Sequence, residues 1–332
     1  MPILGQQVPT LLEVSKQFGS DGQPLPLAEL LSQENEALDD IPFYEANSTA
    51  GHRISVETGL PTAVYRKLNA GILPSKGTAT DVTESMGSLT SLGKVDKLLA
   101  TLSGNIDVFR LRKNRRHMEA MNQTFMQTLL YGDTNGQPES FLGLMPRYSR
   151  VQGAGAPDNA RNVIDAGGTG TDNMSILLIA WGAGSVYGIF PKGTQAGLQH
   201  VDYGEELAIA PDGVGELPML RDWFEWNAGI AVEDWRNIVR IANIDSSDLT
   251  RNAATGADLI DLMVQADELI GTGGNKVWYV PGRVRSFLRR QMLNKANVWI
   301  NTEDISGRRV TTFAGAPVRK IDRMTNAEAR VI

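Results

Sequence analysis

The sequence predicts an α+β protein that is built from several parts. Helical periodicity marks residues 112–131, whereas a largely β pattern fills residues 171–245. A helix, strand, helix order follows over residues 255–295. With 332 residues, the chain is long enough for two or three domains, or for one body with long excursions.

Composition narrows the class of protein before any motif is considered. The 32 basic and 38 acidic residues give a net charge of -6, which argues against a surface that grips nucleic acid throughout. The chain has no cysteine, so disulfides, thiolate nucleophiles and cysteine-based metal sites are excluded. The first residues, MPILGQQVPTLLEVSKQFG, lack the pattern of a signal peptide, and no segment has the length of apolar sequence that a membrane span needs.

Residues 1–46 are predicted to form an arm. Short apolar clusters alternate there with glycine and proline, and the second short helix-like piece, LAELLSQENEAL, has only one narrow apolar stripe. Such a segment cannot bury itself. We therefore expect it to lie on its own subunit or on a neighbouring copy.

A projecting hairpin is predicted next, over HRISVETGLPTAVYRKL at residues 52–68. Ile54 and Val56 alternate with charged and polar residues, and Gly59 with Pro61 separates the two β-rich runs. An isolated hairpin is marginally stable, so a partner subunit is expected to supply its packing. The expected inter-subunit residues are Arg53, Ile54, Val56, Glu57, Leu60, Tyr65, Arg66 and Lys67.

The helix at 112–131 begins in a basic cluster, which is the strongest electrostatic feature of the chain. Basic charge at a helix N-terminus opposes the macrodipole, so either the cluster has an acidic or phosphate partner or the helix tolerates the cost. Ion pairs within or between subunits are the preferred interpretation, because stacking aromatics for nucleic-acid binding are scarce. The residues concerned are Arg110, Arg112, Lys113, Arg115 and Arg116.

The second half of the chain alternates between strands and helices. SILLIAWGAGSVYGIFP predicts two buried strands separated by Gly182 and Gly184, and a further strand pair is expected at 226–232 and 235–242. A helix from 255 to Gly271, the strand KVWYV and a second helix after Pro281 would form a compact unit. FAGAPVRKID predicts a final strand.

No catalytic constellation emerges from the sequence. His52, His117 and His200 lack metal-ligand spacing, so surface or packing roles are preferred and no metal or cofactor is predicted. The Gly-rich segments at 153–157, 167–171 and 271–275 do not match phosphate-binding loops and predict ordinary turns. The acid pairs Asp39–Asp40 and Glu205–Glu206 predict solvated loops, and Ser185 lacks the context of a nucleophile elbow. The chain is therefore not expected to be an enzyme.

Several long strings resemble the major capsid proteins of tailed bacteriophages with the Hong Kong 97-type fold, in particular the epsilon fifteen-like short-tailed group. The strings are LDDIPF at 38–43, GHRISVETGLP at 51–61, YRKLNAGILPSK at 65–76, VDK at 95–97 and YGD at 131–133. The resemblance extends over essentially the whole chain, is strongest in the N-terminal third and is weaker between 140 and 220.

This resemblance implies named parts for each segment. Residues 1–46 would be the N-terminal arm, 47–80 the extended loop, 81–250 the peripheral domain with its spine helix at 112–131, and 251–332 the axial domain with a returning strand. The axial helices follow the long strand region, which suggests a permuted chain order. Lys67 and Lys76 match no crosslinking motif, so self-crosslinking is not implied.

The resemblance also implies a function and partners. The chain would assemble through hexamers and pentamers into the icosahedral shell around a double-stranded DNA genome, within a virion put together in the bacterial cytoplasm. Cement, portal and scaffold proteins and weak contact with packaged DNA are implied, and no membrane. Two alternatives remain open: an encapsulin-like nanocompartment shell and, from another class, a nucleotide- or sugar-handling enzyme using the Gly-rich loops.

Overall fold

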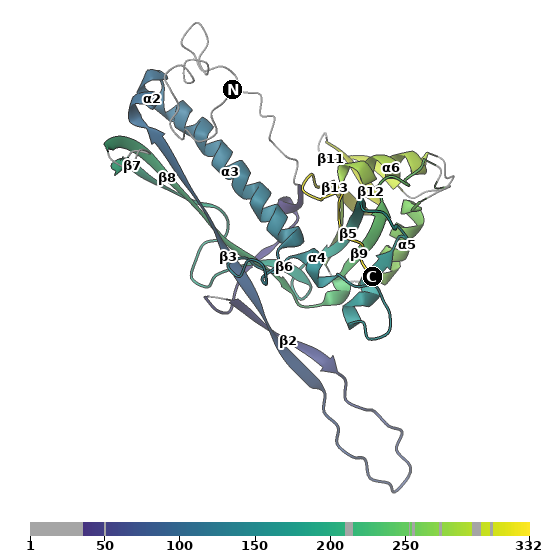
Figure 1. The fold of residues 1–332 in the computed structure, drawn as a ribbon. Helices are drawn as coiled ribbons and strands as arrows, with labels where there is room; N and C mark the ends of the chain where they lie inside the picture. The colour runs from purple at the N-terminus through teal and green to yellow at the C-terminus, as the bar shows by residue number, and fades with distance from the viewer. Residues whose placement is uncertain are drawn as a thin grey trace. The chain divides into compact units, whose positions relative to one another are not determined.

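The computed structural model describes residues 36–49, 51–209, 215–251, 253, 256–271, 274–293, 300–305 and 308–332, so most of the predicted arm lies outside the described residues. The chain divides into two compact units. The described part of unit 1 lies within Ser88–Phe125 and Gly197–Trp226, and unit 2 contains the remaining described residues. The elements β3 (Thr78–Asp96), α3 (Ile106–Tyr131) and β8 (Glu216–Val232) have residues in both units (Figure 1).

Unit 1 combines helices with a two-stranded ribbon. The C-terminal part of β3 leads into α2 (Lys97–Leu102), where the Asp96 side chain caps the helix by accepting from the Leu98 amide at 2.8 Å. The strand β7 (Gln199–Ile209) pairs antiparallel with the first part of β8. A small apolar cluster holds these elements together: Val95, Ala100, Phe109 and Leu220.

The helix α3 starts earlier than its periodicity predicted. It begins at Ile106, and the side chain of Asn105 accepts from the Val108 amide at 3.2 Å, while Asp107 supplies acidic charge in the first turn. The basic cluster therefore lies beyond the first turn, so the predicted conflict with the macrodipole was wrong. An apolar periodicity shows only the buried face of a helix, and the first turns of α3 are largely exposed.

Unit 2 is organised around β5 (Asn173–Trp181), which is buried along its full length. It pairs antiparallel with β9 (Ile238–Asp245) on one side and with β10 (Asn275–Val280) on the other. The sheet continues beyond β10 and β9, and its outer strands are β13 (Ala316–Lys320), β12 (Arg308–Phe313), β11 (Ile300–Ile305) and β4 (Val163–Asp165).

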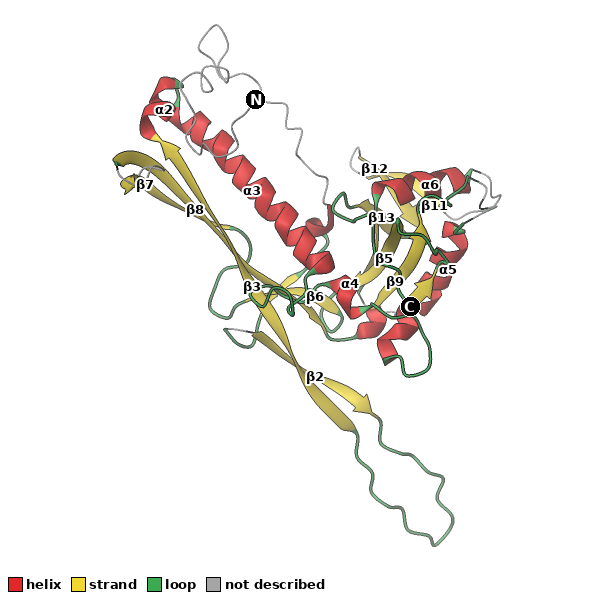
Figure 2. Ribbon diagram, in the orientation of Figure 1, coloured by secondary structure: helices red, strands yellow, loops and turns green. Residues whose placement is uncertain are grey.

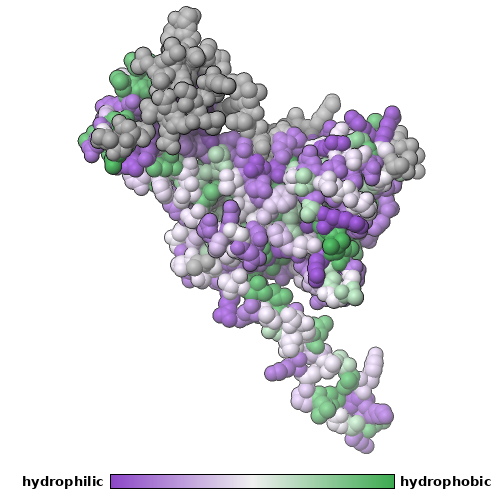
Figure 3. All heavy atoms as spheres, viewed as in Figure 1, coloured by the Kyte–Doolittle hydropathy of each residue, from purple (hydrophilic) through white to green (hydrophobic). Residues whose placement is uncertain are grey.

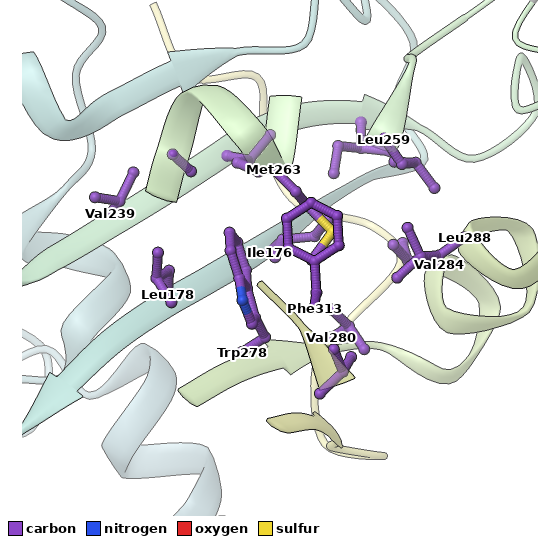
Figure 4. Close-up of a cluster of buried hydrophobic side chains, with 14 of the residues drawn as sticks. Ile176, Leu178, Val239, Leu259, Met263, Trp278, Val280, Val284, Leu288 and Phe313 are labelled. Atoms are coloured by element: carbon purple, nitrogen blue, oxygen red, sulfur yellow. The ribbon is translucent and has the colours of Figure 1, made fainter. Parts of the chain in front are cut away.

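Two helices cover one face of this sheet, as Figure 2 shows. They are α5 (Leu259–Leu269) and α6 (Gly282–Met292), and the predicted helix, strand, helix unit is confirmed. Their buried residues meet alternate side chains of β5 and β9 around Trp278 and Phe313 (Figure 4). The amide of Gln291 fastens the two helices, because it accepts from the Leu259 amide and donates to the Ala257 carbonyl.

The opposite face of the sheet is closed by polar as well as apolar groups. Arg240 of β9 and Glu328 form a buried ion pair at 2.8 Å, and Ser175 of β5 hydrogen-bonds to both. The short α4 (Leu144–Arg147) contributes the Met145 carbonyl, which accepts from Arg240. The remaining short elements are η1 (Glu36–Asp39), η2 (Asp158–Asn162) and η3 (Trp235–Asn237).

The predicted break between two buried strands is confirmed. After β5 the chain turns through Gly184, which has a φ of 75°, and continues as β6 (Val186–Phe190). This strand pairs with β1 (Phe43–Glu45) and with the last residues of β8. The predicted strands at 226–232 and 235–242 correspond to the end of β8 and to β9, and η3 separates them.

The projecting hairpin differs from its prediction. Its first strand is β2 (Gly51–Gly59), with Ile54 buried and its neighbours Arg53 and Ser55 exposed, as the alternation predicted. The second strand is the start of β3, because Gly59 pairs with Thr78. Residues 60–77 contain no strand, so the prediction of a second strand within 62–68 was wrong. The run TAVYRKL alternates like a strand but has no ladder partner.

Candidate assembly surfaces

The loop at residues 60–77, between β2 and β3, has an unusually apolar surface. Its side chains are more than half exposed at Leu60, Val64, Tyr65, Leu68, Ile72 and Leu73. Leu68 is 98% exposed, so it makes almost no contact within the subunit. The space-filling view shows apolar surface near the far end of this loop (Figure 3). Several large apolar side chains that are exposed in one segment in this way mark an interaction site.

Local hydrogen bonds give this loop a defined shape. Ala70 donates its amide to the Lys67 carbonyl at 3.2 Å, and Asn69 lies between them with a φ of 61°. The Arg66 side chain closes the same turn by donating to the Ala70 carbonyl at 2.9 Å. The Ser75 hydroxyl donates to the Thr62 carbonyl and joins the two limbs. The apolar side chains are therefore displayed on a turn that is already formed.

A buried ion pair anchors the hairpin at its base. Arg147 donates to both carboxylate oxygens of Glu84 at 2.6 Å, in the bidentate geometry that guanidinium and carboxylate groups favour. Glu84 is only 5% exposed, although it lies on a strand of the hairpin. No sequence signal could have found this pair, because the partners are 63 residues apart.

The predicted inter-subunit residues fall into two groups. Ile54 and Val56 pack in their own subunit against Tyr187 and Ile189, and Arg53 pairs with Asp81 at 2.6 Å. If Arg53, Ile54 and Val56 contacted a neighbouring subunit, as expected, those contacts would compete with the ones that they make within their own subunit. The other predicted residues are exposed, on β2 or in the loop, and remain candidates: Glu57, Leu60, Tyr65, Arg66 and Lys67. Leu68, Ile72 and Leu73 were not predicted from the sequence, although their string, LNAGIL, is as apolar as the part of the loop that contains the predicted residues.

The histidine in β2 belongs to a polar group behind the hairpin. Tyr187 donates its hydroxyl to Glu233 at 2.6 Å, and His52 Nε2 lies 3.1 Å from the same hydroxyl. Burial raises the pKa of Tyr187, and the carboxylate of Glu233 raises it further. His52 thus has the packing role that the sequence favoured.

The basic cluster is partly neutralised inside unit 1. Arg110 contacts Asp202 at 2.5 Å and the buried Asp222 at 2.9 Å, and His200 Nε2 lies 2.9 Å from the same Asp222 oxygen. The hydrogen bond from Arg110 lowers the pKa of Asp202, and that contact in turn raises the pKa of Arg110. The acidic partner of Arg110 is therefore intramolecular.

The rest of the cluster follows α3. Lys113 lies over the ring of Phe109 at 5.3 Å, and its pKa is lowered, first by burial and then by the charges of Arg116 and Arg112. Arg115 and Arg116 are exposed. This face of the helix is positively charged and suits a phosphate or carboxylate partner.

The Gly-rich segment at 167–171 and the acid pairs, which were considered for enzyme chemistry, have structural roles. A Cβ at Gly168 or Gly170 would meet Asn243 or Asp245 at less than 2.5 Å, so the 167–171 segment lies directly against β9. The acid pairs were wrongly predicted as solvated loops, because Asp40 pairs with Arg319, and Glu205 and Glu206 lie in β7. Over the described ranges, His, Asp and Glu form no group of three that could hold a metal ion.

No helix among the described elements has the length and apolar character to cross a membrane. A search of curated protein sequences gave no match.

Comparison with known proteins gave one family model and a series of structures. The model for major capsid protein GP7 matches residues 19–332. A chain in the near-atomic-resolution structure of bacteriophage Epsilon15 is 31% identical, with a TM-score of 0.78, and the match covers 100% of this chain and 99% of that one. The match therefore spans nearly the whole length of both chains.

More distant structures also match. The capsid of bacteriophage JBD30 has 10% identity and a TM-score of 0.45, covering 89% of this chain and 92% of that one. The holo-SrpI encapsulin complex of Synechococcus elongatus PCC 7942 has 11% identity and a TM-score of 0.41, covering 72% and 96%. Both TM-scores are below 0.5.

A long helix, a projecting β-hairpin and a helix-covered sheet, together with the GP7 family model and the Epsilon15 match, define a phage capsid protein with the Hong Kong 97-type fold. The resemblance seen in the sequence is thereby confirmed. The chain belongs to the family of major capsid protein GP7. As such it is a structural protein of the capsid in a phage virion.

Proposed function

We propose that copies of this chain close into an icosahedral shell through hexamers and pentamers, and that the 60–77 loop of each copy lies on a neighbouring subunit. The exposed apolar surface of that loop carries the proposal. A single copy leaves Tyr65, Leu68 and Leu73 in water on a preformed turn. Burying them against a second copy would supply the packing that the hairpin lacks.

Charge supports the same contact. Arg66, Lys67 and Lys76 make the loop basic, and residues 60–77 contain no acid, whereas the whole chain has a net charge of -6. The basic loop of one copy and the net acidic surface of another copy therefore attract each other. This attraction favours a contact in which the loop lies on the neighbouring copy. No catalytic step is part of this role.

The same role includes further partners. An icosahedral shell around double-stranded DNA calls for portal and scaffold proteins, and a cement protein would reinforce its outside. A net acidic shell would contact packaged DNA weakly, and the exposed Arg115 and Arg116 of α3 are the residues we assign to such a phosphate contact.

The test is assembly with and without the apolar side chains of the loop. We expect negative-stain microscopy of the expressed protein to show closed shells. The combined substitutions Tyr65→Ser, Leu68→Ser and Leu73→Ser should leave soluble, folded subunits but no stable shells. Thr62→Ser with Ala63→Ser, in the same loop, removes little apolar surface and should assemble as the wild type does.

Two results would contradict the proposal in different ways. Normal shells from the triple variant would overturn the role of the loop. A wild-type protein that forms no shells, pentamers or hexamers under any condition would overturn the shell function itself. Deleting the loop must spare Ile54, because that residue is part of the core of unit 2.

A further inference from the structure

The two helices that cover the sheet of unit 2 carry matching outward stripes. On α5, Asp261, Val264 and Glu268 are exposed at positions i, i+3 and i+7. On α6, Arg283, Ser286 and Arg290 are exposed at the same spacing. Residues at this spacing lie on one face of a helix. Each helix thus presents a charged residue, a small or apolar one, and a second charge of the same sign.

The charges on these helices are fully segregated. α5 contains Asp261, Asp267 and Glu268 and no basic residue, whereas α6 contains four arginines and no acidic residue. Within the described ranges, no salt bridge joins Asp261 or Glu268 to an arginine of α6. Asp267, which is not part of the stripe, pairs with Lys276.

The helix dipoles explain the positions of only two of the four charged residues in the stripes. Asp261 in the first turn of α5 and Arg290 in the last turn of α6 complement the helix dipoles. Glu268 in the last turn of α5 and Arg283 in the first turn of α6 oppose them. These two residues need a different explanation, because each places its charge at the unfavourable end of its helix.

The two arginines of the α6 stripe are held by neutral groups. Arg283 donates to the Ser246 carbonyl at 3.0 Å, and the guanidinium of Arg290 lies over the ring of Phe287 at 5.0 Å. Neither contact neutralises the positive charge. On α5, Asp261 accepts from the uncharged amide of Gln265 at 2.7 Å. The stripes therefore keep opposite charges facing outward.

We propose that the α5 stripe of one copy docks against the α6 stripe of the next copy. Asp261 and Glu268 would meet the two arginines, with Val264 opposite Ser286 between them. The equal spacing allows both ion pairs to form at once. This inference rests on the proposed shell function and adds the residues that join one subunit to the next around a ring.

The geometry of such a contact leads to closed rings. In the proposed arrangement each copy offers α5 to one neighbour and α6 to a different neighbour, so the contact is heterologous. Repetition of a heterologous contact generates a ring when the rotation closes. Exposed ion pairs add little affinity each, so these pairs select which faces meet rather than supplying most of the binding.

Charge reversal tests the proposal. One variant carries Asp261→Lys with Glu268→Lys, the second carries Arg283→Glu with Arg290→Glu, and the third carries all four substitutions. We expect each of the first two to lower the yield of shells about tenfold, and the third to recover most of the yield. Thermal unfolding of the subunits shows whether each variant is folded.

A control reverses charges elsewhere in unit 2. Glu139 and Arg150 are exposed and lie outside both helices, so Glu139→Lys with Arg150→Glu should keep the wild-type yield. An equal loss of shells in this control, or a fourfold variant that recovers nothing although it folds, would overturn the proposal.

Disulfide formation gives an independent readout, because the natural chain has no cysteine. A Val264→Cys protein mixed with a Ser286→Cys protein can form a disulfide between these positions only between copies. We expect covalent dimers after mild oxidation of the mixture, and none when Val264→Cys is mixed with Glu139→Cys. The absence of crosslinks in shells that do form would contradict the contact.

The two hypotheses fail differently. If wild-type shells form and neither reversal affects them, the α5–α6 contact is wrong and the shell function stands. If the wild type forms no shells, the shell function fails, and the cysteine mixture still reports whether α5 meets α6 in smaller oligomers.

Discussion

Glu84 and Arg147 show how single residues fix the base of the hairpin. The pair is bidentate and nearly buried, whereas Arg53 and Asp81 form an exposed pair on the same hairpin. Breaking a buried pair leaves an uncompensated charge away from water, while an exposed charge is solvated by water. The two pairs should therefore differ strongly in their effect on stability.

We expect Arg147→Ala to lower the free energy of unfolding by about 3–5 kcal/mol, because Glu84 would be left buried and unpaired. Arg53→Ala is the matched control and should cost less than about 1 kcal/mol. Urea denaturation of both variants measures the difference. Similar losses from the two substitutions would contradict the importance of burial at this pair.

The Arg110–Asp202 contact predicts a dependence of stability on pH. Since Arg110 lowers the pKa of Asp202 in the folded state, the contact stabilises the fold above the unfolded pKa of an aspartate, about 4, and is lost as the pH falls below it. Asp202→Asn should therefore reduce stability at neutral pH. The difference from the wild type should shrink below about pH 4, as measured by denaturation at a series of pH values. A constant difference at all pH values would argue against the ion pair.

At the scale of elements, the segment at 321–332 is fastened across the polar face of the sheet in unit 2. Asn243 forms two hydrogen bonds of 2.8 Å with the backbone of Val331, and Glu328 donates its amide to the Asn173 carbonyl. The Glu328 carboxylate also accepts from Tyr131 at 2.7 Å and from the buried Arg240. The Glu328 side chain thus joins α3, β5 and β9 to the segment at 321–332.

Glu328→Ala should lower the free energy of unfolding by about 3–5 kcal/mol, because Arg240 would lose its buried counter-ion. The segment should also become accessible to proteases. Arg330→Ala is the control within the same segment, since Arg330 is exposed, and it should change neither property. Thermal unfolding and limited proteolysis provide the two measurements.

Sequence patterns predicted some elements better than others, for physical reasons. The helices α5 and α6 were found because each buries one apolar face, and because Gly271 marks the end of α5 and Pro281 the start of α6. The start of α3 was missed because its first turns bury little. The partner of β2 was missed because strand pairing depends on register, and Thr78 is far from Gly59 in sequence.

The candidate site was predicted only in part. The apolar loop could be located from its sequence, but the exposure of Leu68 and Leu73 required the structure, because apolar residues are usually buried. The sequence alone could not show whether Ile54 packs inside its own subunit or contacts a neighbouring one. The division of the chain at 46, 80 and 250, and the suggested permuted order, remain predictions.

At the scale of the whole molecule, the fold was predictable mainly through the resemblance. Composition and periodicity indicated an α+β protein with projecting parts, and the family match supplied the Hong Kong 97-type fold. Long-range ion pairs cannot be derived from local patterns, because nothing in the segment around either partner indicates the other. How these ion pairs help to specify the fold can be seen only in the three-dimensional structure.

The ion pair between Asp40 and Arg319 has a consequence for the timing of folding. Its partners are separated by 279 positions, so it forms only after nearly all of the intervening chain has left the ribosome. The pairing of β13 with β10 also forms late, because β13 lies near the end of the chain. The loop at 60–77 is synthesised long before the sheet of its subunit is complete. Nascent chains therefore expose their apolar loop before they can present a finished partner surface, and this interval is when chaperones would be needed.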